Sequence, residues 1–186
     1  MSILLVSFSV RKSPGNCIRI VNYISQILDM QEIDFSKLEM KNYKIEACFN
    51  CNYECFSFNK ECPKNDDVIK LYKKVSNFDI FIMVIPVYSE VLCSKYFSWR
   101  ERSQCVFKNN DLYSKYKNVK KNYIVIGNEE AGGKTAVNVI KSYQEEYGEI
   151  MLLQSHKHNQ KSLDGNLIEC KDVKIKIKRY IEQLVL

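Results

Sequence analysis

Four cysteines crowd into one short stretch of the chain, between residues 48 and 62: Cys48, Cys51, Cys55 and Cys62. Core packing does not require thiols at such close spacing. Cysteine thiolates can hold an iron–sulfur cluster through a compact run of short gaps that ends in a more distant ligand, often followed by proline, as Cys62 is by Pro63. The spacing therefore predicts a metal or cluster site in this stretch.

Two other interpretations of these cysteines stay open. A zinc site would use the same thiolates, although structural zinc sites more often pair two Cys-x-x-Cys knuckles across a longer gap. Two disulfides are the third interpretation, but residues 1–10 carry neither a basic leader nor a small-residue cleavage site, which predicts a cytoplasmic, reducing location. The remaining cysteines are scattered, and most of them are expected to be small buried hydrophobes: Cys17, Cys93, Cys105 and Cys170.

The elements that must position these thiols alternate between strand and helix. Short apolar runs predict strands at residues 3–7, 32–35, 79–86, 122–127 and 150–153. Apolar residues at helical spacing predict helices at residues 16–30, 68–75, 92–106, 135–147 and 171–184. This alternation indicates an α/β fold, a three-layer sandwich whose right-handed crossovers give a doubly wound, five-stranded parallel sheet. Ligands bind such sheets at the carboxyl ends of the strands.

Three polar loops follow those strand ends and are expected to converge on one site: residues 7–17, 86–92 and 127–134. The first offers the hydroxyls of Ser9 and Ser13, the cation of Arg11 and the N–H groups that open a helix, a combination suited to a phosphate. The ring of Tyr88 in the second loop can stack on a planar ligand, and the glycines of the third allow close approach of the backbone. The alternatives are an ordinary capped turn for the first loop, a solvent-facing tyrosine at a strand end for the second and a flexible turn for the third.

The chain has 186 residues and a formal net charge of +6. This length suits one domain, and no apolar stretch is long enough to span a membrane. The basic residues lack the interleaved aromatics of a nucleic-acid site, so we expect a solvated basic face and neither a nucleic-acid nor a membrane partner. Those residues are Lys115, Lys117, Lys120, Lys121, Lys174, Lys176, Lys178 and Arg179.

Taken in order along the chain, these features resemble a known family. The first strand leads into the loop from Ser9 to Asn16, the cysteine run and the Asp66-Asp67 pair follow, and the long apolar strand enters Pro86-Val87-Tyr88 before Glu101-Arg102. This order is similar to the NADPH-dependent FMN reductase family of flavodoxin-like proteins, and within it to the iron–sulfur flavoproteins. The resemblance implies strand order 2-1-3-4-5 and a single flavodoxin-like domain over residues 1–186, with a cysteine-rich insertion at about residues 46–65.

The resemblance also implies cofactors and a role. The protein would be an FMN-dependent oxidoreductase or electron-transfer protein, either NAD(P)H-dependent or ferredoxin-linked, that relays electrons between flavin and an iron–sulfur cluster without a catalytic side chain. A redox partner protein or NAD(P)H and a homodimer or homotetramer are implied as partners. Cys48, Cys51, Cys55 and Cys62 would hold a four-iron, four-sulfur cluster. The implied FMN contacts are Ser9, Arg11, Ser13, Asn16, Cys17, Pro86, Val87, Tyr88, Ser89, Gly127, Asn128, Gly132 and Gly133.

The sequence departs from the family pattern at three places. Phe8 stands where the family favours glycine, Cys17 replaces a hydroxyl donor to the phosphate, and Glu90-Val91 replaces a Gly-Ser pair. A thiol is a weak donor, and a carboxylate near phosphate or reduced flavin is repulsive. Two alternatives therefore stay open: a flavin-only NAD(P)H-dependent FMN or quinone reductase with zinc or no metal at the cysteines, and a cofactor-less flavodoxin-fold interaction protein.

Overall fold

The computed structural model describes residues 1–185 except 50, 52–53, 57–61, 144–146 and 162–164. Five parallel strands form its sheet in the order β2-β1-β3-β5-β6, and the short β4 pairs antiparallel with the end of β3. Without the β4 hairpin this is the order 2-1-3-4-5, so the predicted flavodoxin-like, doubly wound fold is confirmed. The strands are β1 (Ser2–Ser7), β2 (Asp34–Glu39), β3 (Ile80–Tyr88), β4 (Val91–Leu92), β5 (Lys120–Ile126) and β6 (Ile150–Leu153).

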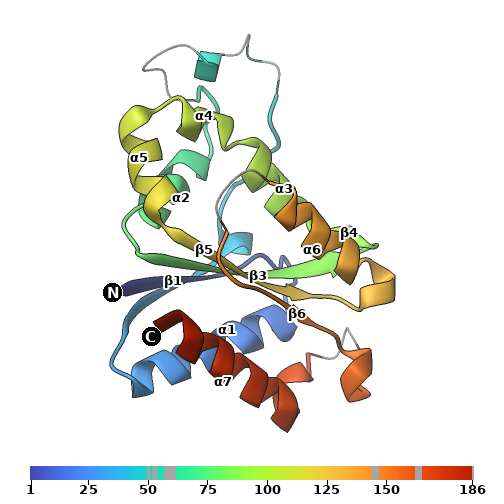
Figure 1. The fold of residues 1–186 in the computed structure, drawn as a ribbon. Helices are drawn as coiled ribbons and strands as arrows, with labels where there is room; N and C mark the ends of the chain where they lie inside the picture. The colour runs from blue at the N-terminus through green and yellow to red at the C-terminus, as the bar shows by residue number, and fades with distance from the viewer. Residues whose placement is uncertain (50, 52–53, 57–61, 144–146, 162–164, 186) are drawn as a thin grey trace.

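Helices cover both faces of the sheet (Figure 1). One face carries α1 (Asn16–Met30) and α7 (Lys171–Val185), and the other carries α2 (Val68–Val75), α3 (Ser94–Glu101), α4 (Gln104–Phe107), α5 (Asn110–Asn118) and α6 (Gly133–Lys141). Single 3-10 turns lie in the connections: η1 (Met40–Asn42), η2 (Glu54–Phe56), η3 (Glu129–Ala131), η4 (His156–His158) and η5 (Leu167–Glu169).

Each face of the sheet has its own apolar core. Alternate residues of β1 point to opposite faces, so Leu4 packs with one cluster and Ile3 with the other. The larger cluster is centred on Trp99, whose ring stacks on Tyr72 at 3.8 Å between centroids. None of the helices in the described part of the chain is long and apolar enough to cross a membrane.

Three predicted elements differ from the structure. The helix predicted at residues 135–147 is α6, which begins at Gly133 and ends at Lys141. The helix predicted at residues 92–106 is divided into α3 and α4, because the chain turns at Arg102 and the side chain of Arg102 enters a buried ion pair. The separate α5 was not predicted, although Asn109 is a recognisable N-cap whose side chain accepts from the N–H of Leu112 at 3.0 Å. The second strand, predicted at 32–35, runs over Asp34–Glu39 because its register is set by pairing with β1.

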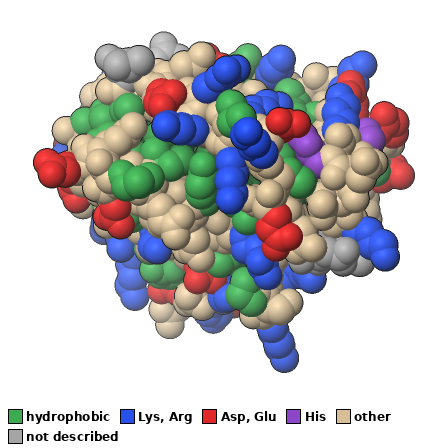
Figure 2. Space-filling view, turned by 90° about the horizontal axis from the view of Figure 1, so that it is seen from below, with side chains coloured by type: hydrophobic (Ala, Val, Ile, Leu, Met, Phe, Trp, Pro, Cys, Tyr) green, Lys and Arg blue, Asp and Glu red, His purple; other side chains and the backbone are tan. Residues whose placement is uncertain are grey.

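All the basic residues of the predicted face except Lys121 are exposed as expected, but they do not form one face, because α5 and α7 cover opposite sides of the sheet. Lysines and arginines lie among acidic side chains on the surface seen from the side of α1 and α7 (Figure 2). Lys121 is the exception. Its side chain is buried, and its ammonium donates to the carbonyl oxygens of Tyr116 and Val119 at the end of α5. These acceptors offset the cost of burying the charge, and they are close to Lys121 only because β5 follows α5 directly.

Candidate functional site

A cavity of about 260 Å³ lies at the carboxyl ends of β1, β3 and β5. The three predicted loops do converge on it. Ten of the predicted cofactor contacts line it: Ser9, Arg11, Asn16, Cys17, Pro86, Val87, Tyr88, Ser89, Gly127 and Asn128. Ser13, Gly132 and Gly133 are not among its lining residues, whereas five residues that were not predicted are: Gly15, Glu90, Ile126, Ala131 and Ser155.

The first wall of this strand-end pocket is the N-terminus of α1. Gly15, its N-cap, contributes no side-chain cap, and the first turn holds no acidic residue, so the positive end of the helix dipole faces the pocket. The side chain of Arg11 lies over Gly15, since a Cβ built on that glycine would be 3.2 Å from Nη1 of Arg11. Asn16 has a structural bond as well, because its side-chain oxygen accepts from the N–H of Leu167 at 3.0 Å.

Two acidic groups of the pocket, the Cys17 thiol of the first wall and the Tyr88 phenol of the second loop, stay neutral. Burial raises the pKa of the Cys17 thiol far above its usual range, and the nearby Cys93 raises it further. Burial also raises the pKa of Tyr88, although the hydrogen bond with Ser9, 3.3 Å from the phenol oxygen, opposes the shift. Cys17 therefore brings no negative charge to the pocket at neutral pH, and the cation of Arg11 is not offset by it.

The second wall is a tight hairpin between β3 and β4. Pairing of Tyr88 with Val91 leaves Ser89 and Glu90 as the two turn residues, with φ of 47° and 68°. Two positive φ angles define the turn that suits paired strands, but Asn-Gly is the sequence that adopts it readily, so Ser-Glu is strained. Backbone strain of this kind gathers at functional sites.

The third wall fits against this hairpin through two glycines. Gly132 has φ of 87°, and a Cβ built on it would overlap the backbone of Glu90. A Cβ built on Gly127 would lie 2.6 Å from Cγ2 of Val87. The glycines of the third loop therefore hold the loop against the hairpin, and Gly132 shapes the pocket without lining it.

The four clustered cysteines meet at a second, much smaller cavity, of about 20 Å³. Cys48, Cys51, Cys55 and Cys62 all line it, and they are joined by Cys105, which the sequence alone did not connect with them. All eight cysteines of the chain are free thiols. Burial raises the pKa of Cys55, and the neighbouring thiols of Cys51, Cys62 and Cys48 raise it further.

The donor set of this cavity fits a thiophilic group, but its placement does not enclose a single ion. Among the described residues, no group of three or more His, Cys, Asp or Glu side chains is placed to hold a metal ion. A four-iron cluster makes a different demand, because each thiolate binds a different iron. A bound cluster would also need a larger volume than the present cavity of about 20 Å³.

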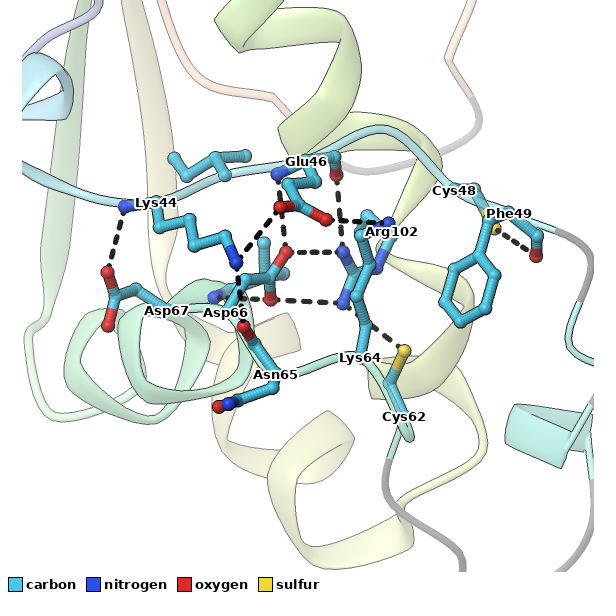
Figure 3. Close-up of polar contacts among 12 residues, drawn as sticks. Lys44, Glu46, Cys48, Phe49, Cys62, Lys64, Asn65, Asp66, Asp67 and Arg102 are labelled. Carbon is cyan, nitrogen blue, oxygen red and sulfur yellow. Dashed lines mark hydrogen bonds and ion pairs between the residues drawn. The ribbon is translucent and has the colours of Figure 1, made fainter.

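Arg102 connects this cavity with the rest of the fold (Figure 3). Its guanidinium forms two hydrogen bonds with Asp66, at 2.6 and 3.2 Å, and the two side chains are 2% and 0% exposed. It also donates to the carbonyl oxygen of Glu46 and to Sγ of Cys62, each at 3.2 Å. Burial would raise the pKa of Asp66, but the hydrogen bonds from Arg102 and from two backbone N–H groups outweigh it and lower the pKa.

The two cavities lie at opposite ends of α3. At its start, the thiol of Cys93 donates to the carbonyl oxygen of Phe8 at 3.5 Å, beside the first pocket loop. At its end, Glu101 accepts from the N–H of Cys48 at 2.5 Å, and Arg102 follows. The eight residues of this helix span about 12 Å.

The fold and the strand-end pocket together define a flavodoxin-like α/β protein with a cavity at the carboxyl edge of its sheet, where parallel sheets of this kind usually bind ligands. Residues 1–92, which supply the first two pocket walls and the cysteines between them, match the family of NADPH-dependent FMN reductases. No curated protein matches the chain by sequence.

Solved structures share the fold at low sequence identity. The NAD(P)H:quinone oxidoreductase from Methanothermobacter marburgensis has a TM-score of 0.69 at 10% identity, over 100% of this chain and 98% of that one. A putative quinone reductase from Klebsiella pneumoniae has a TM-score of 0.65 at 12% identity, over 99% of this chain and 85% of that one. RosB, solved with bound 8-demethyl-8-formylriboflavin-5'-phosphate, has a TM-score of 0.64 at 13% identity, over 98% and 81%.

Proposed function

We propose that the chain is an FMN-dependent oxidoreductase whose strand-end pocket binds the flavin nucleotide. One observation carries the proposal: the α1 N-terminus, with no acidic residue in its first turn and Arg11 beside it, opens on a cavity completed by the two other strand-end loops. The family match over residues 1–92 and the flavin bound in RosB support it.

The chain's own residues would divide the binding between phosphate and ring. Arg11 and the first N–H groups of α1 would hold the phosphate, and the neutral thiol of Cys17 would add no repulsion. Tyr88, at the rim of the cavity, would lie along the flavin, and the hairpin turn would shield it from water. Bound flavin would supply hydride and single-electron chemistry, so no side chain is needed as nucleophile or general base.

Phe8 and Glu90, two of the departures from the family pattern, differ in their effect on FMN binding. Phe8 is fully buried and packs edge-on against Tyr96 at 5.7 Å, so it belongs to the core and does not obstruct the pocket. Glu90 does line the pocket, and its carboxylate opposes the binding of a phosphate or a reduced ring. Of the two side chains, only Glu90 therefore counts against FMN.

Binding of FMN and riboflavin to the same protein tests the proposal, because riboflavin lacks the phosphate. Arg11→Gln should weaken FMN binding by about 1.5–3 kcal/mol, the value of a hydrogen bond to a charged group, and leave riboflavin binding unchanged. Arg19→Gln, which removes an exposed arginine of α1 itself, is the control. Failure of FMN to bind, or equal losses for both ligands, would contradict the proposal and favour the cofactor-less alternative.

We also propose, as a second candidate function, that the cysteine cavity holds an iron–sulfur cluster and exchanges single electrons with the flavin. The observation in its favour is that all four clustered cysteines line one cavity beside Arg102. Any electron would travel the length of α3 between the two sites. NAD(P)H or a redox protein as electron donor, and assembly as a homodimer or homotetramer, have only the family likeness in their support.

Anaerobic purification followed by iron, sulfide, zinc and flavin analysis of one sample tests the second function. Iron and sulfide together support the relay, whereas zinc or no metal supports the flavin-only reductase. Cys51→Ala should abolish iron binding and leave FMN binding intact. Retention of full iron by that variant would remove Cys51 from the ligand set.

A further inference from the structure

We propose that Arg102 is a positioning residue for the cysteine site: held by Asp66, it fixes the sulfur of Cys62 against the start of the cysteine segment, residues 48–62, before any cluster binds. The inference rests on the second candidate function above. It goes beyond that function because it assigns a role to a side chain that is not a ligand.

The five N–H donors of the Arg102 guanidinium support this role. Arginine has five N–H groups in a rigid fork. Two of them bind the carboxylate of Asp66, one binds the carbonyl of Glu46, and one binds Sγ of Cys62. The fifth, on Nε, is buried and has no hydrogen-bond partner among the described residues. The guanidinium thus points one donor at a cysteine sulfur, and Arg102 itself lines the cavity that the thiols share.

The contacts of Arg102 join both ends of the cysteine segment. Glu46 lies just before Cys48, and Cys62 ends the segment, so one side chain holds the two ends together (Figure 3). Glu101 adds a second anchor through the N–H of Cys48. Because both anchors belong to the end of α3, the sulfur of Cys62 and the backbone of Cys48 are tied to a helix that packs in the core.

Stability alone does not explain a buried pair of this kind. Well-packed apolar side chains of similar size usually stabilise a core as well as a buried ion pair does, since both charges must lose their water. What an apolar pair cannot do is donate N–H groups to Cys62 and Glu46. A role in fixing the sulfur of Cys62 accounts for these donors. Loss of a group that hydrogen-bonds to a metal ligand and orients it typically changes metal affinity by about 10–100-fold.

The test compares iron and sulfide uptake by full-length variants during anaerobic reconstitution. Arg102→Met with Asp66→Leu removes the pair without leaving an unpaired buried charge, so the fold should persist. Arg102→Lys keeps the charge beside Asp66 but cannot reach Asp66, Glu46 and Cys62 together. Lys70→Gln, which breaks an exposed ion pair of α2 with Asp67, is the matched control.

We expect both Arg102 variants to bind iron and sulfide about 10–100-fold more weakly than the wild type, with the control unchanged. FMN binding and the thermal unfolding midpoint, measured on the same samples, should stay near wild-type values in the double variant. Wild-type uptake by the double variant would overturn the inference and leave the cluster proposal standing. A wild-type chain that takes up no iron would refute the cluster proposal and this inference together, without touching the FMN proposal.

Hydrogen exchange on the metal-free protein gives a second readout, because the two ends of the cysteine segment are proposed to be held together before a cluster binds. The N–H of Glu46 donates to Asp66 at 3.2 Å, so it should be protected in the wild type and lose protection in the double variant. The N–H of Cys48 depends on Glu101 and should keep its protection in both. Fast exchange at both amides in the metal-free wild type would contradict the proposal that these contacts exist before a cluster binds.

Discussion

Replacing Gly132 by alanine should destabilise the fold and change the shape of the strand-end pocket, although Gly132 does not line that pocket. Gly132 has φ of 87°, which costs an alanine about 1–2 kcal/mol. In addition, the new Cβ would overlap the backbone of Glu90, which cannot move away as a flexible side chain can. The β3–β4 hairpin must therefore shift, at a further cost of about 1–3 kcal/mol by analogy with overpacked cores.

Gly165 provides the matched control. Its φ of 77° imposes the same backbone strain on alanine, but the nearest atom to a new Cβ is Nε of Arg19 at 3.2 Å, the movable end of a side chain. Gly165→Ala should thus lose only about 1–2 kcal/mol, and Gly132→Ala about 2–5 kcal/mol, of unfolding free energy. Urea unfolding at equal m-values measures both.

The same comparison separates stability from pocket shape. Gly132→Ala should weaken FMN binding by at least about tenfold, or about 1.4 kcal/mol, because the hairpin that carries Tyr88 moves. Gly165→Ala should bind FMN nearly as the wild type does. Equal unfolding free energies for the two variants would refute the claim that Gly132 is required for contact with the hairpin, whatever the FMN result.

Three further predictions concern backbone strain in the β3–β4 turn, the N-cap of α5 and the stability of the fold at low pH. Glu90→Gly should relieve the strained backbone of the turn, raise the unfolding free energy by about 1–2 kcal/mol and tighten FMN binding. Glu90→Gln removes the charge alone, so it should tighten FMN binding without raising the unfolding free energy. A Gln variant as stable as the Gly variant would exclude backbone strain as the cause of the gain. Asn109→Ala should cost about 1 kcal/mol in urea unfolding through loss of its cap on α5, with FMN binding unchanged, and a neutral result would mean that the cap is not needed. The lowered pKa of Asp66 means that its ionised form stabilises the fold above the unfolded pKa of about 3.9, and that this contribution is lost as the pH falls through the folded value. Urea midpoints should therefore fall below about pH 5 more steeply for the wild type than for the Arg102→Met, Asp66→Leu double variant, and parallel curves would show that the pair does not set the acid response.

Much of the fold could be predicted because its signals are local. The apolar run of β3 indicates a strand buried on both faces, and the apolar stripes of α1 and α7 indicate helices that cover a sheet. The strand-end loops followed from the alternation of strands and helices, since parallel strands place the loops that follow them at one edge. Ten of the predicted contacts line the pocket for this reason.

The features that were missed depend on residues distant in sequence. The break between α3 and α4 follows the pairing of Arg102 with Asp66, 36 residues away. Cys105 shows no spacing pattern with the other thiols and reaches their cavity only because α4 packs beside the cysteine segment. A lysine at position 121 is expected to be exposed to solvent. The adjacent end of α5 supplies the carbonyl oxygens that offset the cost of burying its charge.

The sequence by itself thus determined the layered α/β fold, the edge at which a ligand would bind and the clustering of four thiols, because hydrophobic period and residue spacing act over a few neighbouring residues. Only the tertiary structure decided that Gly132 fits against the Glu90 turn, that a fifth thiol joins the four, and that a buried guanidinium holds Cys62. Each of these depends on a backbone or side-chain approach between distant segments, which packing sets and local sequence does not encode.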